Sequence, residues 1–494
     1  MVSLINLILY QYPFFKFVLT NSNSTSINGI ILLLSLVIAA ILLNALVFYI
    51  GLYLLRNVGK WLIALFFNIS ALSVYFINTY GVIIDRSMIG NVLNTDYEES
   101  TSFLSFGLLL YIVFLGILPS LLLFKFEIIR PKLKRFTLHA VLTLIFLGFI
   151  SFANSSNWLW IDKNSKTLGG LVMPWSYVVN TSRYYSYINR KEKKQILLPN
   201  ATIKNDEKSV VVLVIGESAR SNNFSLYGYE KNTNPLLSQI KKLKHFKAES
   251  CATYTTEGVK CILDYKNTNK LYEILPNYLY RNDVDVIWKT TNWGEPTISV
   301  EKFQNKDFLR KNCEGPNCGY DEILLNGLND QILASEKNKI LVVLHSSTSH
   351  GPTYYKKYPK QFEKFTPVCK SVELGDCTQQ ELINAYDNTI LYTDYILASL
   401  IDNLKQLNEY KTSMIFVSDH GESLGESNLY MHGMPTSLAP KEQLDIPFLV
   451  WTSENSRTIK ESQEYSQHNI FHSVLDFLAI DSPVYEKDMS IFDN

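Results

Sequence analysis

The chain has 494 residues, more than one small domain requires, and its 46 basic and 46 acidic residues leave no net charge. A neutral chain has no overall field that favours nucleic acid or an acidic partner, so we expect no nucleic-acid partner. The average conceals a division, because residues 1–175 are largely apolar whereas residues 185–494 have the composition of a soluble protein.

Four uncharged stretches in the first part are each long enough to cross a bilayer, which requires about 20 residues. They are Ile27–Leu55, Trp61–Ile84, Ser100–Phe124 and Phe136–Ile161. A weaker stretch, Leu4–Thr20, contains Lys16. We interpret it as a fifth span and not as a cleaved signal peptide, because no basic residue precedes its apolar part. The sequence therefore predicts a five-helix transmembrane domain over residues 1–161.

Basic residues cluster in two of the loops between these spans. Arg56 and Lys60 lie between the second and third spans. The loop between the fourth and fifth spans contains Lys125, Arg130, Lys132, Lys134 and Arg135. Because basic loops remain in the cytoplasm, we expect the N-terminus inside and the chain leaving the fifth span on the far side. The C-terminal part should then lie outside the cytoplasm.

All six cysteines lie in the soluble part of the chain. Closeness in sequence favours three disulfides among the possible connectivities: Cys251–Cys261, Cys313–Cys318 and Cys369–Cys377. Such local loops are typical of an oxidising compartment. A zinc site made from cysteines is the alternative, although the chain contains no CxxC pair.

Residues 162–208 form a predicted connector, whose tyrosine-rich segment 182–188 is typical of a helix at the membrane interface. From Ser209 onward, short apolar runs alternate with helical patterns. The predicted strands are Val210–Ile215, Val284–Trp288, Ile340–Leu344, Met414–Val417 and Ile446–Trp451, and the predicted helices are Leu382–Leu404 and His468–Leu478. This order predicts an α/β domain over residues 209–494 with a mostly parallel central sheet.

Acidic and imidazole side chains follow three of these strands. Glu217 follows the first strand, Asp419 and His420 follow Met414–Val417, and His345 and His350 follow Ile340–Leu344. Active sites of such folds lie at the carboxyl edge of the sheet, and this residue set suits a divalent metal, zinc above all. The alternative interpretations are a helix-capping Glu217, an Asp–His loop pair and a hydrogen-bonded core His345.

A nucleophile is harder to choose from the sequence. Metal-assisted phosphoryl transfer needs an oxygen or sulfur nucleophile, and the segment 251–256 is rich in hydroxyls. Spacing does not distinguish Thr253, Thr255 and Thr256, and a threonine-rich surface turn is the alternative.

Five segments, in this order, resemble one known family. They are GESARSNNFSLYGY (216–229), SCATYTTEGVKC (250–261), SHGPTYYKKYP (349–359), SDHGESLGE (418–426) and YMHGMPTSLAPKEQ (430–443). The chain resembles the lipid A phosphoethanolamine transferases, which include enzymes conferring polymyxin resistance and belong to the alkaline phosphatase/sulfatase-like superfamily. The resemblance implies an alkaline-phosphatase-like fold for the soluble domain.

The resemblance also implies roles for particular residues. Thr255 matches the nucleophile, which is bound to the metal. Glu217, Asp419 and His420 match its partners on the main zinc ion, Zn²⁺. His350 and His432 match a pair that serves a second zinc or the substrate phosphate.

In the membrane part, Asn91, Thr95 and Glu99 match residues that bind the phosphoethanolamine headgroup. Their spacing of four residues would place them on one face of a helix, and a polar end of a juxtamembrane helix is the alternative. Asn292 matches a substrate-site asparagine. The lysine that often follows it in the family has no clear counterpart in TTNWGEP (290–296).

We therefore expect a monomeric, multi-pass enzyme of a bacterial inner membrane with its catalytic domain in the periplasm. It would transfer phosphoethanolamine from phosphatidylethanolamine to lipid A, to the lipooligosaccharide core or to proteins, through a covalent threonine intermediate. The alternatives are a phosphoglycerol transferase or phosphodiesterase of the same superfamily, and a non-catalytic membrane-anchored binding protein.

Overall fold

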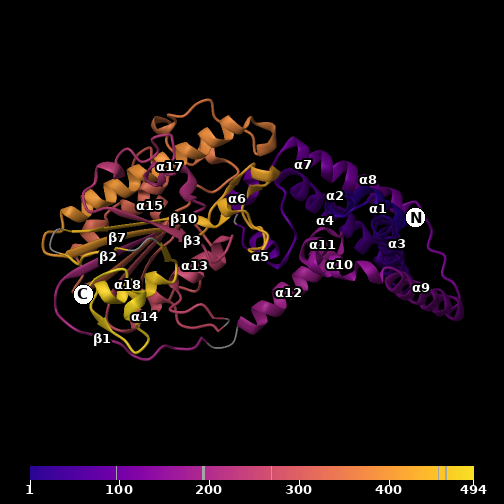
Figure 1. The fold of residues 1–494 in the computed structure, drawn as a ribbon, viewed down its shortest axis with the longest axis horizontal. Helices are drawn as coiled ribbons and strands as arrows, with labels where there is room; N and C mark the ends of the chain where they lie inside the picture. The colour runs from indigo at the N-terminus through magenta and orange to yellow at the C-terminus, as the bar shows by residue number, and fades with distance from the viewer. Residues whose placement is uncertain (96, 192–194, 269, 454–455, 462–463, 494) are drawn as a thin grey trace. The chain divides into compact units, whose positions relative to one another are not determined.

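A computed structural model describes the chain except for residues 96, 192–194, 269, 454–455, 462–463 and 494 (Figure 1). The chain forms two compact units. The first comprises Met1–Val92 with Phe103–Ser186, and the second comprises Leu93–Ser102 with Tyr187–Asn494. The predicted connector therefore contributes residues to both units.

The first unit is helical. Within the described residues, four helices are long and apolar enough to cross a membrane: α3 (Ile27–Leu55), α4 (Asn57–Tyr80), the run Phe106–Phe124 formed by α7 (Phe106–Tyr111), η1 (Ile112–Ile117) and α8 (Leu118–Phe124), and α9 (Leu133–Ala153). Helices α1 (Val2–Tyr10) and α2 (Tyr12–Asn21) are bent by 59° and would add a fifth span if the pair crosses as one. The predicted count of five depends on this bent pair.

Two of the predicted spans end earlier in the structure. Helix α4 ends before Gly81, which has a φ of 73° and caps the helix in the left-handed conformation that glycine adopts without strain. Helix α9 ends at Ala153, before the polar run 154–157. Three further helices follow: α10 (Trp158–Lys163), α11 (Ser165–Leu171) and α12 (Trp175–Lys191).

The helix expected to present Asn91, Thr95 and Glu99 on one face is interrupted. Helix α5 (Arg86–Asn94) ends before Thr95, and α6 (Tyr97–Ser102) begins after it. Short polar side chains such as those of Asn94 and Thr95 favour local hydrogen bonds over helix continuation, which explains the break. The prediction of one continuous helix is wrong, and the side chain of Glu99 lies outside the described part of the structure.

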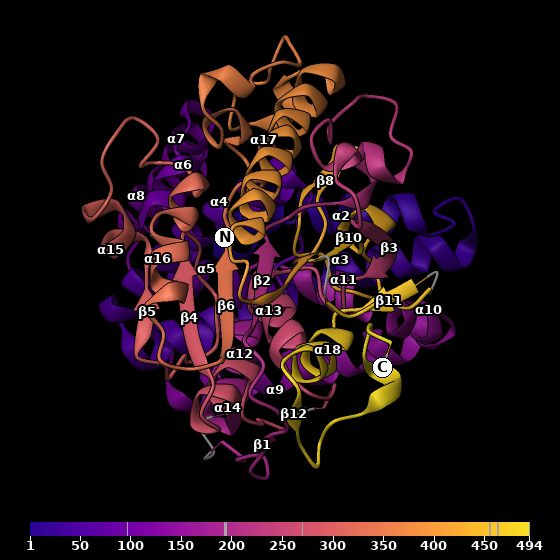
Figure 2. The same cartoon turned by 90° about the vertical axis from the view of Figure 1, so that its left-hand side faces the viewer.

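The second unit is built on an eight-stranded sheet with the order β11-β3-β10-β7-β2-β6-β4-β5, half of which Figure 2 shows side by side from β2 to β5. The strands are β2 (Ser209–Gly216), β3 (Lys244–Glu249), β4 (Asp285–Thr290), β5 (Lys302–Gln304), β6 (Lys339–His345), β7 (Lys411–Ser418), β10 (Asp445–Thr452) and β11 (Glu464–Ser466). Each predicted strand is present. The sheet is mixed, because β10 runs antiparallel to both of its neighbours while the other pairings are parallel.

Helices cover both faces of this sheet (Figure 1). Helix α17 (Gln379–Lys405) lies on one face, and α13 (Thr255–Leu263), α14 (Leu275–Arg281) and α18 (Asn469–Phe477) lie on the other. Alternate residues of the strands, such as Leu213, pack in one core with Ile262 of α13 and Phe471 of α18. The two predicted helices thus appear as α17 and α18.

Smaller elements complete the unit. They are β1 (Thr202–Ile203), which pairs with β12 (Ile480–Asp481), the hairpin of β8 (Ser423–Leu424) and β9 (Tyr430–Met431), and helices α15 (Lys306–Lys311) and α16 (Leu328–Leu333). All three predicted disulfides are formed, Cys251–Cys261, Cys313–Cys318 and Cys369–Cys377.

Register explains where the site forms. Gly216 at the end of β2 pairs with Ser418 at the end of β7, and Ile215 pairs with His345 at the end of β6. Because these three strands are parallel, the residues that follow them emerge at the same edge of the sheet.

Candidate active site

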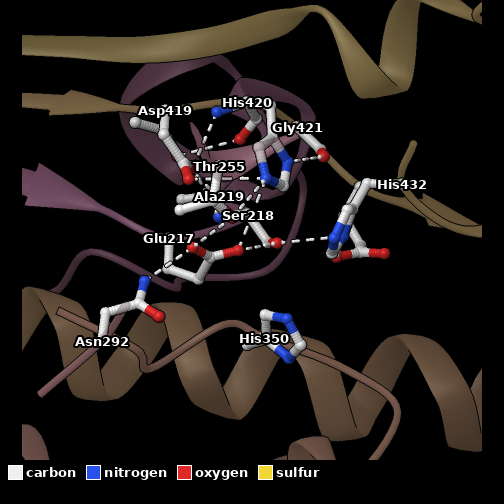
Figure 3. Close-up of polar contacts among 12 residues, drawn as sticks. Glu217, Ser218, Ala219, Thr255, Asn292, His350, Asp419, His420, Gly421 and His432 are labelled. Carbon is white, nitrogen blue, oxygen red and sulfur yellow. Dashed lines mark hydrogen bonds and ion pairs between the residues drawn. The ribbon is translucent and has the colours of Figure 1, made fainter. Parts of the chain in front are cut away.

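Four predicted site residues meet at this edge, and Figure 3 shows their contacts. Glu217 follows β2, Asp419 and His420 follow β7, and Thr255 is the first residue of α13. The hydroxyl of Thr255 donates to Oε2 of Glu217 at 3.2 Å and lies 3.4 Å from Nε2 of His420. All four side chains are buried.

Close packing sets the position of Thr255. Helix α13 crosses the chain at Asp419 so closely that a Cβ at Gly258 would lie 2.4 Å from the carbonyl oxygen of Asp419. The Cys251–Cys261 disulfide joins the preceding loop to the same helix. The hydroxyl of Thr253 donates instead to the carbonyl of Met434. The sequence left three threonines open as the nucleophile. Among the described contacts, it is the hydroxyl of Thr255 that reaches Glu217 and His420.

Backbone carbonyls orient two of the imidazoles. Nδ1 of His420 lies 2.9 Å from the carbonyl oxygen of Gly421, and Nδ1 of His350 lies 2.7 Å from that of Gly351. A carbonyl only accepts, so Nδ1 of each of these two rings carries a proton. The ring of His432 lies 4.3 Å from that of His420 and 5.4 Å from that of His350, measured between centroids.

Burial and mutual charge set the protonation of the cluster. Burial raises the pKa of Asp419, and the charge of Glu217 raises it further. Burial also acts to raise the pKa of Glu217, but the nearby imidazoles, that of His420 first, outweigh it and lower that pKa. Burial lowers the pKa of His420 to about 4. Of the two carboxylates, Glu217 is therefore the one that ionises more readily.

This donor set fits a metal ion. Ligand atoms of Glu217, His420 and His432 lie within 4.8 Å of one another. Oδ2 of Asp419 is buried, accepts no hydrogen bond from the described residues and lies 3.4 Å from Nε2 of His420. Carboxylate oxygens and neutral imidazole nitrogens are ligands that zinc prefers. The group defined by these distances contains His432, which the resemblance pairs with His350, together with Glu217 and His420.

Asn292 and His345 lie on the other side of Glu217. Nδ2 of Asn292 donates to Oε2 of Glu217 at 2.7 Å and lies 3.2 Å from Nε2 of His345. His345 is fully buried and hydrogen-bonded, as its core interpretation states. It nevertheless orients a residue of the site, because Asn292 contacts it directly.

Two further residues of the cluster have no counterpart in the sequence-based prediction. Ser218, whose φ is 53°, donates from its backbone N–H to Oδ1 of Asp419 and from its hydroxyl to Oε1 of Glu217. Oε2 of Glu422 lies 3.1 Å from Nδ1 of His432. Ser218 lies in the segment 216–229 and Glu422 in the segment 418–426, both of which carry the family resemblance. Their closeness in sequence to Glu217 and His420 is the signal that could have identified them as site residues.

Each of the two units matches a known protein family. The model of the phosphoethanolamine transferase EptA/EptB family matches residues 30–188, and the sulfatase family model matches residues 209–480. The phosphoethanolamine transferase EptA of Helicobacter pylori is 39% identical over 99% of this chain and 95% of its own length. The phosphatidylethanolamine transferase Mcr-1 of Escherichia coli is 34% identical over 81% of this chain and 80% of its own.

A solved structure agrees over the whole chain. The integral membrane lipooligosaccharide phosphoethanolamine transferase A of Neisseria meningitidis is 29% identical, superposes with a TM-score of 0.90 and covers 99% of this chain and 97% of its own. Identity above 30% over nearly the full length of a relative establishes the family. The chain belongs to the phosphoethanolamine transferase EptA family.

Proposed function

We propose that the protein transfers phosphoethanolamine from phosphatidylethanolamine to lipid A or the lipooligosaccharide core, through a phosphoethanolamine–threonine intermediate on Thr255. The observation that carries this proposal is the hydroxyl of Thr255, which lies within hydrogen-bond reach of both Glu217 and His420. Relatives named as phosphoethanolamine and phosphatidylethanolamine transferases support the same reaction.

Glu217, Asp419 and His420 would hold zinc, which when bound supplies Lewis-acid chemistry that lowers the pKa of a neighbouring hydroxyl. Thr255 attacks the phosphorus of the donor, so that its Oγ1–P bond forms while the bond from phosphorus to the diacylglycerol oxygen breaks. The proton of the threonine hydroxyl passes to that oxygen, and diacylglycerol leaves.

In the second step an acceptor oxygen attacks the phosphorus and the Oγ1–P bond breaks, which restores the threonine hydroxyl. His350, whose Nδ1 donates to the carbonyl of Gly351, would take a proton from an acceptor hydroxyl and return it to Thr255. His432, whose Nδ1 lies 3.1 Å from Oε2 of Glu422, would stabilise the phosphoryl oxygens or a second metal ion.

The membrane unit would place this chemistry at the donor lipid. We infer that residues 1–161 span the bacterial inner membrane, that residues 162–208 connect them to the catalytic domain, and that residues 209–494 lie in the periplasm. The three disulfides are consistent with that oxidising compartment. Asn91, Thr95 and Glu99 would contribute to recognition of the donor headgroup.

Intact-mass spectrometry of the full-length protein after incubation with phosphatidylethanolamine tests the proposal. We expect an added phosphoethanolamine on Thr255, and we expect its loss, together with transfer, in Thr255→Ala. The matched control Thr256→Ala changes the adjacent hydroxyl and should retain both. An adduct on Thr253 or Thr256 would disprove the assignment, and an adduct carrying phosphoglycerol would disprove the donor.

A further inference from the structure

A cavity of about 200 Å³ lies within the first compact unit, and all of its lining residues belong to that unit. It is formed by the end of α3, the start of α4, the end of α8 and the segment 126–131 that leads into α9. Leu52 and Ile128 contribute to its apolar walls, whereas Lys60 and Arg130 bring two cations to it.

The charges of the lining do not cancel. Lys60 and Arg130 carry two positive charges and Glu127 carries one negative charge, which leaves an excess of one positive charge. Nζ of Lys60 donates to the carbonyl of Phe126, and Nε of Arg130 donates to the carbonyl oxygen of Tyr53 at 2.8 Å. A carbonyl oxygen orients a cation without neutralising it, so the cavity attracts an anion.

Aromatic contacts hold Arg130 in place. The ring of Phe136, from α9, stacks on the ring of Tyr53 with 3.8 Å between centroids and 12° between planes. The guanidinium carbon of Arg130 lies 4.9 Å from the centroid of the same Tyr53 ring. This cation–π contact and the hydrogen bond to the Tyr53 carbonyl fix the segment 126–131 against α3. The cation is therefore positioned before any ligand binds, which lowers the entropic cost of binding.

The cavity lies at one end of the spanning helices. Helix α9 begins at Leu133, directly after the segment that lines the cavity, and ends at Ala153, from which the chain continues towards the second unit. A spanning helix has its two ends at opposite faces of the bilayer, so the cavity opens at the face opposite that exit. Leu54 and Ile129 at this end are 63% and 89% exposed, as is normal for side chains that meet lipid.

We propose that this cavity binds the phosphate group of an anionic phospholipid in the cytoplasmic leaflet, at a site separate from that of the donor lipid. Its assignment to the cytoplasmic leaflet rests on the proposed membrane topology. A phosphodiester carries one negative charge, which matches the excess charge of the lining, and Lys60 and Arg130 would donate charge-assisted hydrogen bonds to it. Basic cavities between the cytoplasmic ends of spanning helices suit such headgroups.

Size and charge select the ligand further. The cavity is smaller than the about 300–1,000 Å³ that encloses a whole small-molecule ligand, so it would hold the headgroup while the acyl chains lie along the exposed apolar side chains. Phosphatidylethanolamine and phosphatidylcholine carry a cationic group that cancels the phosphate charge. A lipid with a net negative charge therefore fits the cavity better than either of them.

Native mass spectrometry of the full-length protein in a neutral detergent tests the proposal. The protein is titrated with dioleoylphosphatidylglycerol, and separately with dioleoylphosphatidylcholine, which has the same acyl chains and phosphate but no net charge. In Lys60→Gln/Arg130→Gln, one phosphatidylglycerol adduct of the wild type should weaken by about tenfold or more, because two charge-assisted contacts are lost. We expect phosphatidylcholine to form that adduct at least about tenfold more weakly in the wild type.

The matched control is Lys134→Gln/Arg135→Gln. It removes the same two side-chain types from exposed positions at the start of α9, outside the cavity, and should retain the adduct within about twofold. If the first variant fails to fold, Lys60→Gln alone serves as the test and should weaken the same adduct.

Four binding results would overturn the proposal. They are an unchanged adduct in a folded cavity variant, equal weakening in the cavity variant and the control, equally tight binding of phosphatidylcholine, and displacement of the lipid by inorganic phosphate at equal concentration. The second would assign binding to the general charge of the loop, and the fourth would assign the cavity to a small anion.

The leaflet is tested separately by labelling. All six native cysteines are paired in disulfides, so Ile129→Cys introduces a single free thiol at an exposed position of the cavity. A membrane-impermeant maleimide should label it in disrupted membranes and not in intact spheroplasts. Labelling in intact spheroplasts would refute the leaflet, and with it the proposed topology, independently of the binding result.

Discussion

Replacement of Gly258 by alanine should separate the nucleophile from its partners with the smallest possible change in the chain. Gly258 lies in α13, one turn after Thr255, where the helix crosses the backbone of Asp419. The new Cβ would lie 2.4 Å from the carbonyl oxygen of Asp419, whereas ordinary contact begins at 3.4 Å. The obstacle is backbone on both sides, so the helix and the loop must move apart by about 1 Å.

That displacement acts directly on the catalytic geometry. Thr255 moves with the helix and Asp419 moves with the loop, so the contacts of 3.2 and 3.4 Å from the hydroxyl to Glu217 and His420 lengthen beyond hydrogen-bond range. A misplacement of about 1 Å at reacting groups costs about 100-fold in rate. Overpacking of this kind lowers the free energy of unfolding by about 1–3 kcal/mol, which leaves a domain of this size folded.

The assay is transfer of a labelled headgroup to lipid A, with thermal unfolding and an intact-disulfide count measured on the same preparation. Gly375→Ala is the matched control, because its Cβ would meet the side chain of Tyr430 at an ordinary 3.6 Å. We expect the control to retain activity and Gly258→Ala to lose about 99% of it. Activity of Gly258→Ala above about half of the wild-type rate, in a folded sample, would refute the close approach as the determinant of the site.

Four further outcomes are expected. Replacing Cys251 and Cys261 by serine should lower the free energy of unfolding by about 2–3 kcal/mol and reduce transfer, as thermal unfolding and activity would report. A zinc chelator should abolish transfer and added zinc should restore it, while Glu217→Gln should bind less zinc by elemental analysis. Glu99→Gln should weaken transfer from phosphatidylethanolamine but spare hydrolysis of a small soluble phosphodiester, and equal loss of both would contradict its proposed role. Burial raises the pKa of Asp394 to about 7, above its value in the unfolded chain. The protonated acid therefore stabilises the fold by up to about 4 kcal/mol. This contribution to the free energy of unfolding is complete below about pH 4 and is lost as the pH rises through about 7. Thermal unfolding from about pH 5 to 8, compared with Asp394→Asn, measures that contribution.

The central strands and the long helix were predictable because their signals are local. The run Val210–Ile215 is apolar at every position, as expected of a strand that is buried on both faces. Strand β3 (Lys244–Glu249) gave no such signal, since Phe246 is its only buried residue. It is a strand because β10 pairs with it, and that pairing depends on residues about 200 positions further along the chain.

The sequence predicts those site residues that directly follow a strand of the sheet. Glu217, Asp419 and His420 follow buried strands, and parallel register brings them together without further information. The choice of Thr255 depends on where α13 begins and on how closely it packs, which spacing alone does not specify. His432 follows the short strand β9 in a hairpin outside the main sheet, so no rule about the sheet edge places it in the site.

Buried carboxylates show what only the structure could distinguish. Asp387 is as deeply buried as Asp419, but Asn223 donates to its Oδ1, and Tyr229 and Lys231 donate to its Oδ2. Such an acid is fully satisfied by the protein and serves the fold. Asp419 instead has one oxygen that accepts no hydrogen bond from the described residues, and burial together with the nearby charge of Glu217 raises its pKa. Packing alone would not retain two carboxylates so close together, because each makes the other harder to ionise. Their proximity is explained if both are ligands of one cation, because the attraction of each carboxylate to the cation offsets their mutual repulsion.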